Sequence, residues 1–526
     1  MGKNQTLMKP LSLLLLSLSI GWCAWNISGA SLLLFIALVP FFLGLSSISD
    51  CHKKNGLIAV LYLLVFKVVW VAGQVYWLKD VTFDTFFAIV LTHSLLFVLI
   101  LTPSVYFIAN KKTNLAIYFL LIGWILFEYL KQSIALLSPF YILGTSLGEY
   151  PSIIRGYRWI GIEGGSVWIL LVNFFVYKTI ASWKDKVQLK KNVINLGITV
   201  VVPLLLSVVL SVFKNEGVEK VRVAALHTDF NPVNPYYAEH PDVIIDSLWK
   251  LSEGVDRQTE LLVWPETVIT NLGWMQELHQ HAGLDSLQKK IAGYPNLKLV
   301  FGANTNTLPT DKTDEKLNYS SEHNFYYYVH NLAFSLDTIG IQYRSKEIFV
   351  PFQEEIPYVR TFPFLKKMIT VVGNPNYYTQ LENDTDVHYT GKGASYLPLL
   401  CYEICYPLYT AKATGDVGFI AMMGNEHWNT SEKGSEIYFS ILTAIAIQNN
   451  CAILKSSNNG ISVIMNGQGE VLEKKAFGDT GLIQGIVSVK DGNCLYTYIS
   501  GYSYLAALIL FPVLLFRNRR KKQNNN

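Results

Sequence analysis

Three side chains that could do chemistry stand at or near the ends of predicted strands. Glu266 follows the apolar run Leu261–Trp264 after Pro265, Lys346 lies in the strand-like run Ile341–Phe349, and Cys401 ends an apolar run. A thiol can act as a nucleophile, a carboxylate as a base and an ammonium as a positive charge beside an oxyanion. Reactive groups often collect at strand ends in α/β domains. The three residues are far apart in sequence, however, and each alone also suits packing, a turn or a solvated strand face.

The segment that carries these residues has the pattern of an α/β domain of about 270 residues, which is enough chain to bury a core. Short apolar runs typical of buried strands alternate with amphipathic stretches typical of helices. Asn324–Leu336 and Ile341–Phe349 are predicted to form a hairpin around Asp337–Gly340. The other expected strands are Val221–Leu226, Leu261–Trp264, Leu297–Gly302, Ser395–Cys401, Val417–Met423, Cys451–Lys455 and Ile461–Met465, and the expected helices are His240–Gly254 and Ser435–Asn449.

The composition is that of a membrane protein. Of the 526 residues, 51% are hydrophobic and only 16% are charged, whereas a globular domain is roughly 25% charged. This excludes a disordered chain, a collagen and a small disulfide scaffold. The net charge of +4 is too small to indicate nucleic acid binding. Eight apolar runs are predicted to span a membrane: Leu11–Ala24, Ser31–Ser47, Leu57–Leu78, Thr85–Ile108, Asn114–Leu130, Val167–Ser182, Val193–Phe213 and Tyr502–Phe516.

The distribution of Lys and Arg in the short loops predicts the orientation. With eight spans, both termini lie on one side of the membrane. That side carries fifteen basic residues: Lys3, Lys9, Lys53, Lys54, Lys111, Lys112, Lys184, Lys186, Lys190, Lys191, Arg517, Arg519, Arg520, Lys521 and Lys522. The short loops of the other side carry four: Lys79, Lys131, Arg155 and Arg158. We therefore expect both termini in the cytoplasm and the large Val218–Lys490 segment outside.

Four short motifs occur in order along this segment. They are Trp264-Pro265-Glu266-Thr267, Lys346 with Val350-Pro351-Phe352-Gln353-Glu354, Leu400-Cys401-Tyr402-Glu403, and Ser457-Asn458-Asn459-Gly460-Ile461-Ser462. Together they resemble the motifs of the nitrilase superfamily, whose members use a Glu–Lys–Cys set on an α-β-β-α sandwich. The Val-Pro-Phe version, with seven spans before it and one after, is similar to one membrane branch, the apolipoprotein N-acyltransferases.

The membrane part resembles the same family. The segments that carry this resemblance are Gly73-Gln74-Val75-Tyr76-Trp77, Phe127-Glu128-Tyr129-Leu130-Lys131, and Pro139-Phe140-Tyr141 through Gly144-Thr145-Ser146. The resemblance implies a polytopic α-helical membrane domain with seven helices at 1–217. It implies a nitrilase-like α/β sandwich domain at 218–490, and a last membrane helix with a basic tail at 491–526. It further implies a bacterial inner membrane protein with its catalytic domain on the periplasmic side.

The resemblance also implies roles for the residues. Cys401 would attack an ester of a phospholipid acyl donor, Glu266 would act as the base, and Lys346 would stabilise the oxyanion. Glu354, Tyr402 and Glu403 match supporting positions, and we expect Glu354 and Glu403 to orient Lys346 or the incoming amine. The acceptor would be the N-terminal S-diacylglyceryl cysteine of a diacylated apolipoprotein, and membrane lipids would surround the enzyme. No metal or organic cofactor and no nucleic acid partner is expected.

Some segments depart from the family pattern and some motifs point elsewhere. The departures are Asn425-Glu426-His427-Trp428-Asn429, His227-Thr228-Asp229 and Tyr236-Tyr237, which put details of substrate entry in doubt. Gly144-Thr145-Ser146-Leu147-Gly148 fits the G-x-S-x-G pattern of serine hydrolases, but it lies in a predicted membrane-adjacent loop. Two other functions stay open: a membrane-tethered carbon–nitrogen hydrolase acting on a soluble amide or nitrile, and a transporter with an inactive outer domain.

Overall fold

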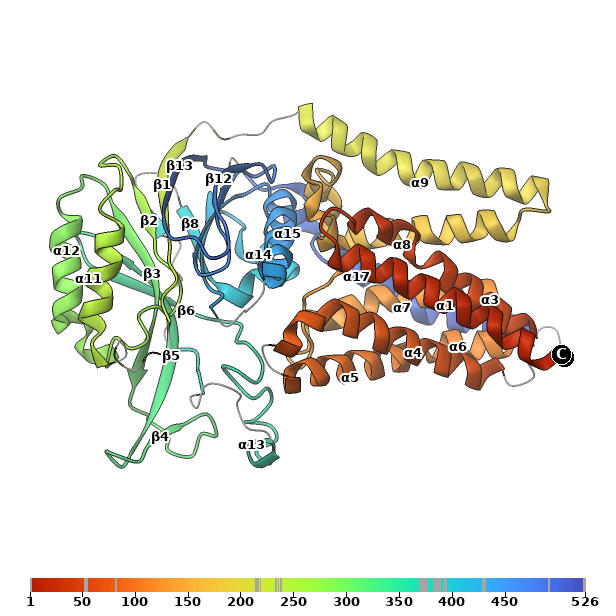
Figure 1. The fold of residues 1–526 in the computed structure, drawn as a ribbon, viewed down its shortest axis with the longest axis horizontal. Coiled ribbons are helices and arrows are strands. Elements are labelled where there is room, and N and C mark those ends of the chain that lie inside the picture. The colour runs from red at the N-terminus through yellow and green to blue at the C-terminus, as the bar shows by residue number, and fades with distance from the viewer. Residues whose placement is uncertain are drawn as a thin grey trace. The chain divides into compact units, whose positions relative to one another are not determined.

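The computed structural model divides the chain into two compact units, Met1–Phe213 with Ile499–Asn526 (unit 1) and Lys214–Tyr498 (unit 2). It describes residues 2–51, 55–80, 83–212, 217, 219–231, 234, 236, 239–368, 377–381, 389–390, 395–427, 432–490 and 492–523. Each unit has its own elements, which are labelled in Figure 1.

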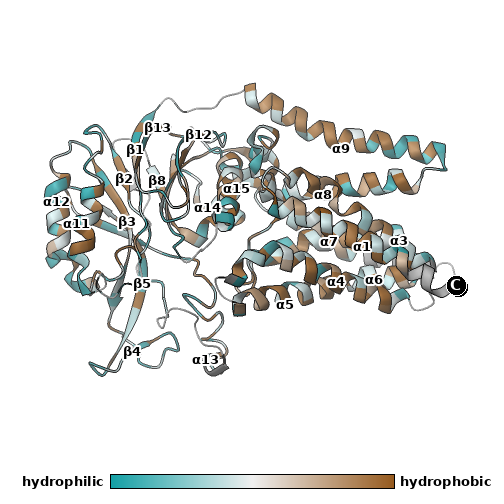
Figure 2. Cartoon of the chain, in the orientation of Figure 1, coloured by the Kyte–Doolittle hydropathy of each residue, from teal (hydrophilic) through white to brown (hydrophobic). Residues whose placement is uncertain are grey.

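Unit 1 is built from helices, because in lipid every backbone polar group must find a partner within the protein. Its longer helices are α1 (Gly2–Asn26), α3 (Val39–Cys51), α4 (Asn55–Val75), α5 (Phe83–Ile100), α6 (Thr102–Ala109), α7 (Thr113–Lys131), α8 (Tyr157–Ala181), α9 (Lys186–Val212) and α17 (Tyr502–Gln523). Short 3₁₀ segments connect several of them, including η3 (Leu143–Glu149). Figure 2 shows long hydrophobic stretches along α4, α5, α8 and α9.

Seven helical segments of the described chain are long and apolar enough to cross a membrane, in agreement with the first seven predicted spans. The protein is therefore a multi-pass membrane protein. The fourth predicted span is shorter than expected: α5 ends at Ile100, and α6 starts afresh with Pro103 in its first turn, where the missing N–H costs nothing. The eighth predicted run forms α17, which packs on α7. The ring centroids of Phe511 on α17 and Phe119 on α7 are 5.2 Å apart. That α17 crosses the membrane stays a prediction.

Two ionisable residues within the predicted spans face protein. Lys67 on α4 is 3% exposed, and its Nζ lies 4.3 Å from the ring centroid of Phe97 and 4.4 Å from that of Phe127. Glu128 on α7 accepts a hydrogen bond from the backbone N–H of Leu143 at 2.8 Å. Burial among rings and backbone donors keeps both groups away from the lipid tails, where a charge is costly.

Among its described residues, unit 2 contains a seven-stranded sheet in which the strand order is β13-β1-β2-β3-β5-β4, with β6 also paired to β5. The bounds are β1 (Lys220–His227), β2 (Leu261–Val263), β3 (Lys298–Thr307), β4 (Asn318–Ser320), β5 (Phe325–Leu336), β6 (Ile341–Ser345) and β13 (Gly481–Ser488). Strands β1, β2 and β3 run parallel, and β5 and β6 form the predicted hairpin, with Leu336 opposite Ile341.

A second sheet, with six strands in the part of the chain that the structure describes, has the order β12-β11-β10-β9-β8-β7. Its strands are β7 (Tyr389–Thr390), β8 (Ser395–Leu400), β9 (Phe419–Asn425), β10 (Ala452–Asn458), β11 (Ser462–Met465) and β12 (Val471–Lys475). Strands β8, β9 and β10 are parallel, and all seven residues of both β9 and β10 are buried. Continuous burial is typical of parallel strands covered on both faces.

Helices cover the outer faces of the two sheets, so unit 2 is an α-β-β-α sandwich (Figure 1). Helices α11 (Pro241–Leu251) and α12 (Ala282–Ile291) lie on the first sheet, and α14 (Pro407–Ala413) and α15 (Glu432–Asn449) lie on the second. Ile245 of α11 and Leu287 of α12 share one apolar core with Leu262 and Phe301 of the sheet. The expected fold class, a polytopic helical membrane part plus an α/β sandwich, is confirmed.

Candidate active site

The backbone holds Glu266 close against strand β3. Strand β2 ends at Val263, and Trp264 continues the alignment by donating its backbone N–H to the Val300 carbonyl at 2.8 Å. Glu266 itself is 3% exposed. A Cβ on Gly302 would lie 2.8 Å from the Glu266 Cα, so only glycine leaves room for this approach.

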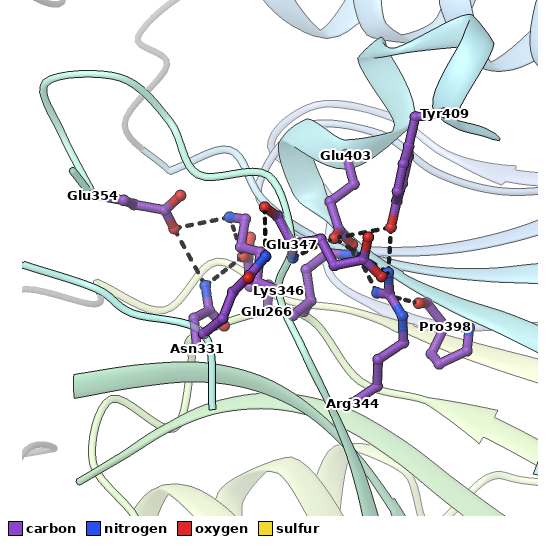
Figure 3. A network of polar contacts seen from close by, with 11 residues as sticks. Glu266, Asn331, Arg344, Lys346, Glu347, Glu354, Pro398, Glu403 and Tyr409 are labelled. Atoms are coloured by element: carbon purple, nitrogen blue, oxygen red, sulfur yellow. Dashed lines mark hydrogen bonds and ion pairs between the residues drawn. The ribbon is translucent and has the colours of Figure 1, made fainter. Parts of the chain in front are cut away.

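Lys346 is the centre of a buried polar network (Figure 3). It directly follows β6 and is 1% exposed, and its Nζ donates to Glu266 Oε1 at 2.9 Å and to Glu354 Oε1 at 2.8 Å. Asn331 on β5 donates its Nδ2 to the same two oxygens, at 2.8 Å and 3.3 Å. The second Glu354 oxygen accepts from the Val350 backbone N–H at 2.7 Å. The geometry therefore pairs one ammonium with two carboxylates.

Cys401 lies in a strained turn at the end of β8. It is the first residue of the 3₁₀ helix η6 (Cys401–Cys405), and its φ of 43° is in the left-handed region, which a non-glycine residue rarely adopts. The residue is 5% exposed. The sulfur accepts a hydrogen bond from the backbone N–H of Asn425 at the end of β9 and lies 4.0 Å from the Tyr438 hydroxyl. The turn thus points the thiol into a closely packed site.

The three groups are close enough to affect one another's protonation. Burial and then the Glu266 charge raise the pKa of the Cys401 thiol well above its ordinary value, against the opposing effect of Lys346. Burial also raises the pKa of Glu266, and Lys346 counteracts it. Burial lowers the pKa of Lys346, but the Glu266 and Glu354 carboxylates outweigh it and raise that pKa well above its usual value. The resting group is therefore a thiol beside a lysinium ion, and a base must activate it.

Glu403 occupies a separate, neighbouring network (Figure 3). Its side chain is fully buried and its Oε2 lies 3.1 Å from Arg344 Nη1. The carboxylate also accepts the backbone N–H groups of Leu400 and Glu347, each at 2.8 Å. Arg344 donates further to the Pro398 carbonyl at 3.1 Å. Glu403 therefore connects the turn that carries Cys401 to the segment that carries Lys346, and its ion pair is with Arg344.

The structure brings Glu266, Lys346 and Glu354 into direct contact and places Cys401 within electrostatic reach of the first two. Tyr402 is buried beside Cys401 and packs edge-on against Tyr406, with ring centroids 5.4 Å apart. Sequence reasoning did not single out Asn331 or Arg344. The available signal was a polar residue inside a predicted strand, since both lie in the β5–β6 hairpin.

Other features of the sequence have a place in the structure. Ser146 of the G-x-S-x-G match lies in η3 of unit 1, where its hydroxyl donates to the Leu143 carbonyl at 2.6 Å, so it is not on a strand–turn–helix. Buried His227 bonds Ser462 Oγ through Nδ1 at 2.7 Å. Trp428, Asn429 and Tyr237 of the departing segments lie outside the described residues. Among the side chains that the structure describes, no group of three or more His, Cys, Asp or Glu could hold a metal ion.

The two-sheet sandwich with a buried Glu–Lys–Cys set, in one chain with a bundle of apolar helices, defines a membrane protein with an α-β-β-α sandwich domain. Residues 19–175 match the family model of the apolipoprotein N-acyltransferase N-terminal domain. Over this region the chain is similar to the apolipoprotein N-acyltransferases.

Individual relatives agree over most of the chain. The apolipoprotein N-acyltransferase of Chlorobaculum tepidum is 24% identical over 94% of this chain and 93% of its own length. That of Geobacter metallireducens is 24% identical over 98% and 96%, and that of Rickettsia prowazekii is 21% identical over 78% and 77%. Among solved structures, the C. elegans NitFhit protein matches 52% of this chain and 61% of its own at 13% identity, with a TM-score of 0.34.

Proposed function

We propose that this protein transfers a fatty acyl chain from a phospholipid to the α-amine of the N-terminal S-diacylglyceryl cysteine of an apolipoprotein. The single observation that carries the proposal is the buried Lys346–Glu266 pair beside a strained cysteine, in a chain that also has a membrane unit. A thiol nucleophile divides such a transfer into two easier steps through a thioester.

In the first step, the Cys401 sulfur attacks the ester carbonyl carbon of the phospholipid. Glu266 accepts the thiol proton, and the ammonium of Lys346 faces the oxyanion of the tetrahedral intermediate. When the carbon–oxygen bond breaks, Glu266 returns the proton to the departing glycerol oxygen. The products are a lysophospholipid and an acyl thioester on Cys401.

In the second step, the α-amine of the lipoprotein cysteine attacks the thioester carbonyl. Glu266 accepts a proton from the amine, the carbon–sulfur bond breaks, and the proton returns to the sulfur. The result is an amide and a free thiol. Because one site serves both steps, we expect ping-pong kinetics.

Glu354 and Glu403 have different supporting roles in this scheme. Glu354 shares the Lys346 ammonium with Glu266 at 2.8 Å, and it therefore orients the cation. Glu403 holds the Cys401 turn through the Leu400 N–H. We further propose that the protein lies in the bacterial inner membrane with unit 2 on the periplasmic side, as the basic loops indicate. In this proposal, residues 1–217, 218–490 and 491–526 are the membrane, catalytic and C-terminal parts.

The test is the intact mass of the purified protein after incubation with phospholipid. We expect the mass to increase by one acyl chain, located on Cys401 by peptide mapping and removed by hydroxylamine. Cys401→Ser should abolish the adduct, because a hydroxyl is far less acidic than a thiol. Cys405→Ser is the matched control and should keep most of the adduct. If no adduct forms on the wild-type protein, or if the two variants behave in the reverse way, the proposal fails.

A further inference from the structure

A further buried ion pair lies near the Cys401 sulfur, and the scheme above does not use it. Lys455 on β10 pairs with Glu426, the residue that directly follows β9, and their side chains are 0% and 1% exposed. Ser435 Oγ donates to Glu426 Oε2 at 2.9 Å, and Ser457 Oγ donates to Oε1 at 3.1 Å. A pair so completely enclosed holds the surrounding elements in one arrangement, because each charge would be costly without its partners.

The ion pair is connected to the catalytic sulfur through Tyr438 on α15. Lys455 Nζ lies 5.4 Å from the centroid of the Tyr438 ring, within the range of a cation–π interaction. Ser435 and Tyr438 are three residues apart on α15 and therefore share a face. The bond from Ser435 to Glu426 thus fixes the helical turn that carries Tyr438.

The Tyr438 hydroxyl is close to two sulfur atoms. It is 4.0 Å from Cys401 Sγ, and it is also hydrogen-bonded to the Cys405 side chain. Burial raises the pKa of Tyr438 well above its ordinary value, so the hydroxyl keeps its proton and remains a donor.

Glu426 also fixes a second donor to the sulfur. It follows Asn425, whose backbone N–H bonds Cys401, and its own N–H donates to the Asn458 carbonyl at 2.9 Å. Its carboxylate packs against Gly460, where a Cβ would lie 2.3 Å from Oε2. The end of β9 is therefore held by the ion pair as well as by the sheet.

We propose that Tyr438 is a further catalytic residue, which donates a hydrogen bond to the Cys401 sulfur when negative charge develops there, and that Lys455 and Glu426 are its positioning residues. This charge develops when Glu266 removes the thiol proton and again when the thioester carbon–sulfur bond breaks, so the assignment rests on the proposed function. Tyr438 stabilises the sulfur anion, whereas Lys346 faces the oxyanion. The other charged or titratable groups acting on this sulfur are Glu266, Lys346 and Glu426, and Cys405 lies beside it.

The test is the rate at which iodoacetamide alkylates Cys401 in the full-length protein, followed from pH 6 to pH 10 by peptide mass spectrometry. This reaction needs the thiolate but no lipid. Tyr438→Phe removes only the hydroxyl. We expect the plot of alkylation rate against pH to shift to higher pH by about one unit, which is about a tenfold loss of rate at fixed pH. Tyr396→Phe is the matched control, because it removes a buried hydroxyl that bonds Ser335. It should leave the profile unchanged.

The positioning role has its own readout. Lys455→Met should slow alkylation by a larger factor in the wild-type background than in Tyr438→Phe, where only the Asn425 donor remains to be disturbed, and Lys455→Arg should restore the rate. An unchanged profile in Tyr438→Phe would overturn the catalytic assignment, and additive losses would overturn the positioning role. If Tyr438→Phe shifts alkylation but no phospholipid acylates the wild-type protein, the proposed function fails while the donor assignment to the sulfur stands.

Discussion

The protonation of Glu266 is balanced between burial and its two donors. Burial favours the neutral acid, whereas the Lys346 ammonium at 2.9 Å and the Asn331 amide at 2.8 Å favour the carboxylate. A base of this kind needs a pKa above that of an exposed carboxyl, so that it can take a proton from a thiol and later return it. The nearby Cys401 thiol, whose pKa is also raised, makes that base necessary.

Substitutions of Glu266 and Lys346 should differ in their response to pH. Glu266→Gln removes the base and should slow single-turnover acylation of Cys401 by roughly 10²–10⁴. Lys346→Met removes the charge at the oxyanion and should cost roughly 10²–10³. Higher pH should partly rescue Glu266→Gln, because hydroxide can form the thiolate, but it should not rescue Lys346→Met. Equal rescue of both variants, or nearly wild-type rates in either, would contradict these roles.

Asn331 influences the lowest pH at which Glu266 can act as a base. Its amide stabilises the charged form of Glu266 and lowers the pKa of that carboxyl. Asn331→Leu has a similar volume and lacks the donor, so the pKa of Glu266 should rise further. Glu266 then needs a higher pH to lose its proton. The fall of the acylation rate at low pH should therefore shift to higher pH, while the rate at high pH changes less. Ser335→Ala, on the same strand, should not shift this fall, and a downward shift in Asn331→Leu would show the reasoning to be wrong.

At the scale of elements, two neighbouring turns are fixed by one carboxylate. The turn at Cys401 is strained, and Glu403 offsets that strain through the Leu400 N–H while Arg344 balances its charge. The same carboxylate binds the Glu347 N–H, next to Lys346. The nucleophile and the lysine thus share a support although they come from different sheets.

Glu403→Gln should therefore destabilise unit 2. It leaves Arg344 with a buried charge whose remaining carboxylate partner, Glu347, is half exposed, and breaking a buried pair costs about 3–5 kcal/mol in the free energy of unfolding. Denaturant unfolding of the detergent-solubilised protein measures the change. Glu347→Gln removes the other carboxylate of the same arginine, and with its 48% side-chain exposure it should cost no more than about 1 kcal/mol. Similar losses in both variants would show that the Glu403 pair has no special weight.

The sequence predicts much of this architecture, because local pattern determines the β5–β6 hairpin and the apolar runs of β1, β2, β8 and β10. It misplaces Lys346, which follows β6 and does not lie within it, since the apolar residues Ile348–Val350 make the predicted strand longer than Ile341–Ser345. It misses β13, which pairs with β1 from the far end of the domain. The Glu403–Arg344 pair likewise joins residues 59 apart, and a single sequence carries no signal for such a long-range pairing.

At the scale of the whole molecule, the apolar surface shows which unit needs lipid. Helix α9 is strongly apolar, yet only 11% of its most apolar stretch is buried inside the protein. Val201, Leu205 and Val208 on this helix are about half exposed or more. Apolar area of this extent is stable only against lipid or another protein. In α8, which has 25 residues against 27 in α9, 67% of the most apolar stretch is buried, so the sequence predicts both helices but not which one lies at the lipid boundary.

The membrane topology is also a prediction about the whole molecule. Fifteen basic residues against four in the short loops place both termini in the cytoplasm if the chain crosses the membrane eight times, and the Val218–Lys490 segment then lies outside. Paired reporter fusions, with alkaline phosphatase for the periplasm and a fluorescent protein for the cytoplasm, should read cytoplasmic after Lys112 and after Lys191. A fusion at Gly254, in the exposed loop after α11, should read periplasmic, and a fusion after Gln523 should again read cytoplasmic. The last fusion tests α17, because a periplasmic signal there with the others unchanged would leave seven spans. A cytoplasmic signal at Gly254 would contradict both the orientation and a function that takes its substrates from the outer leaflet.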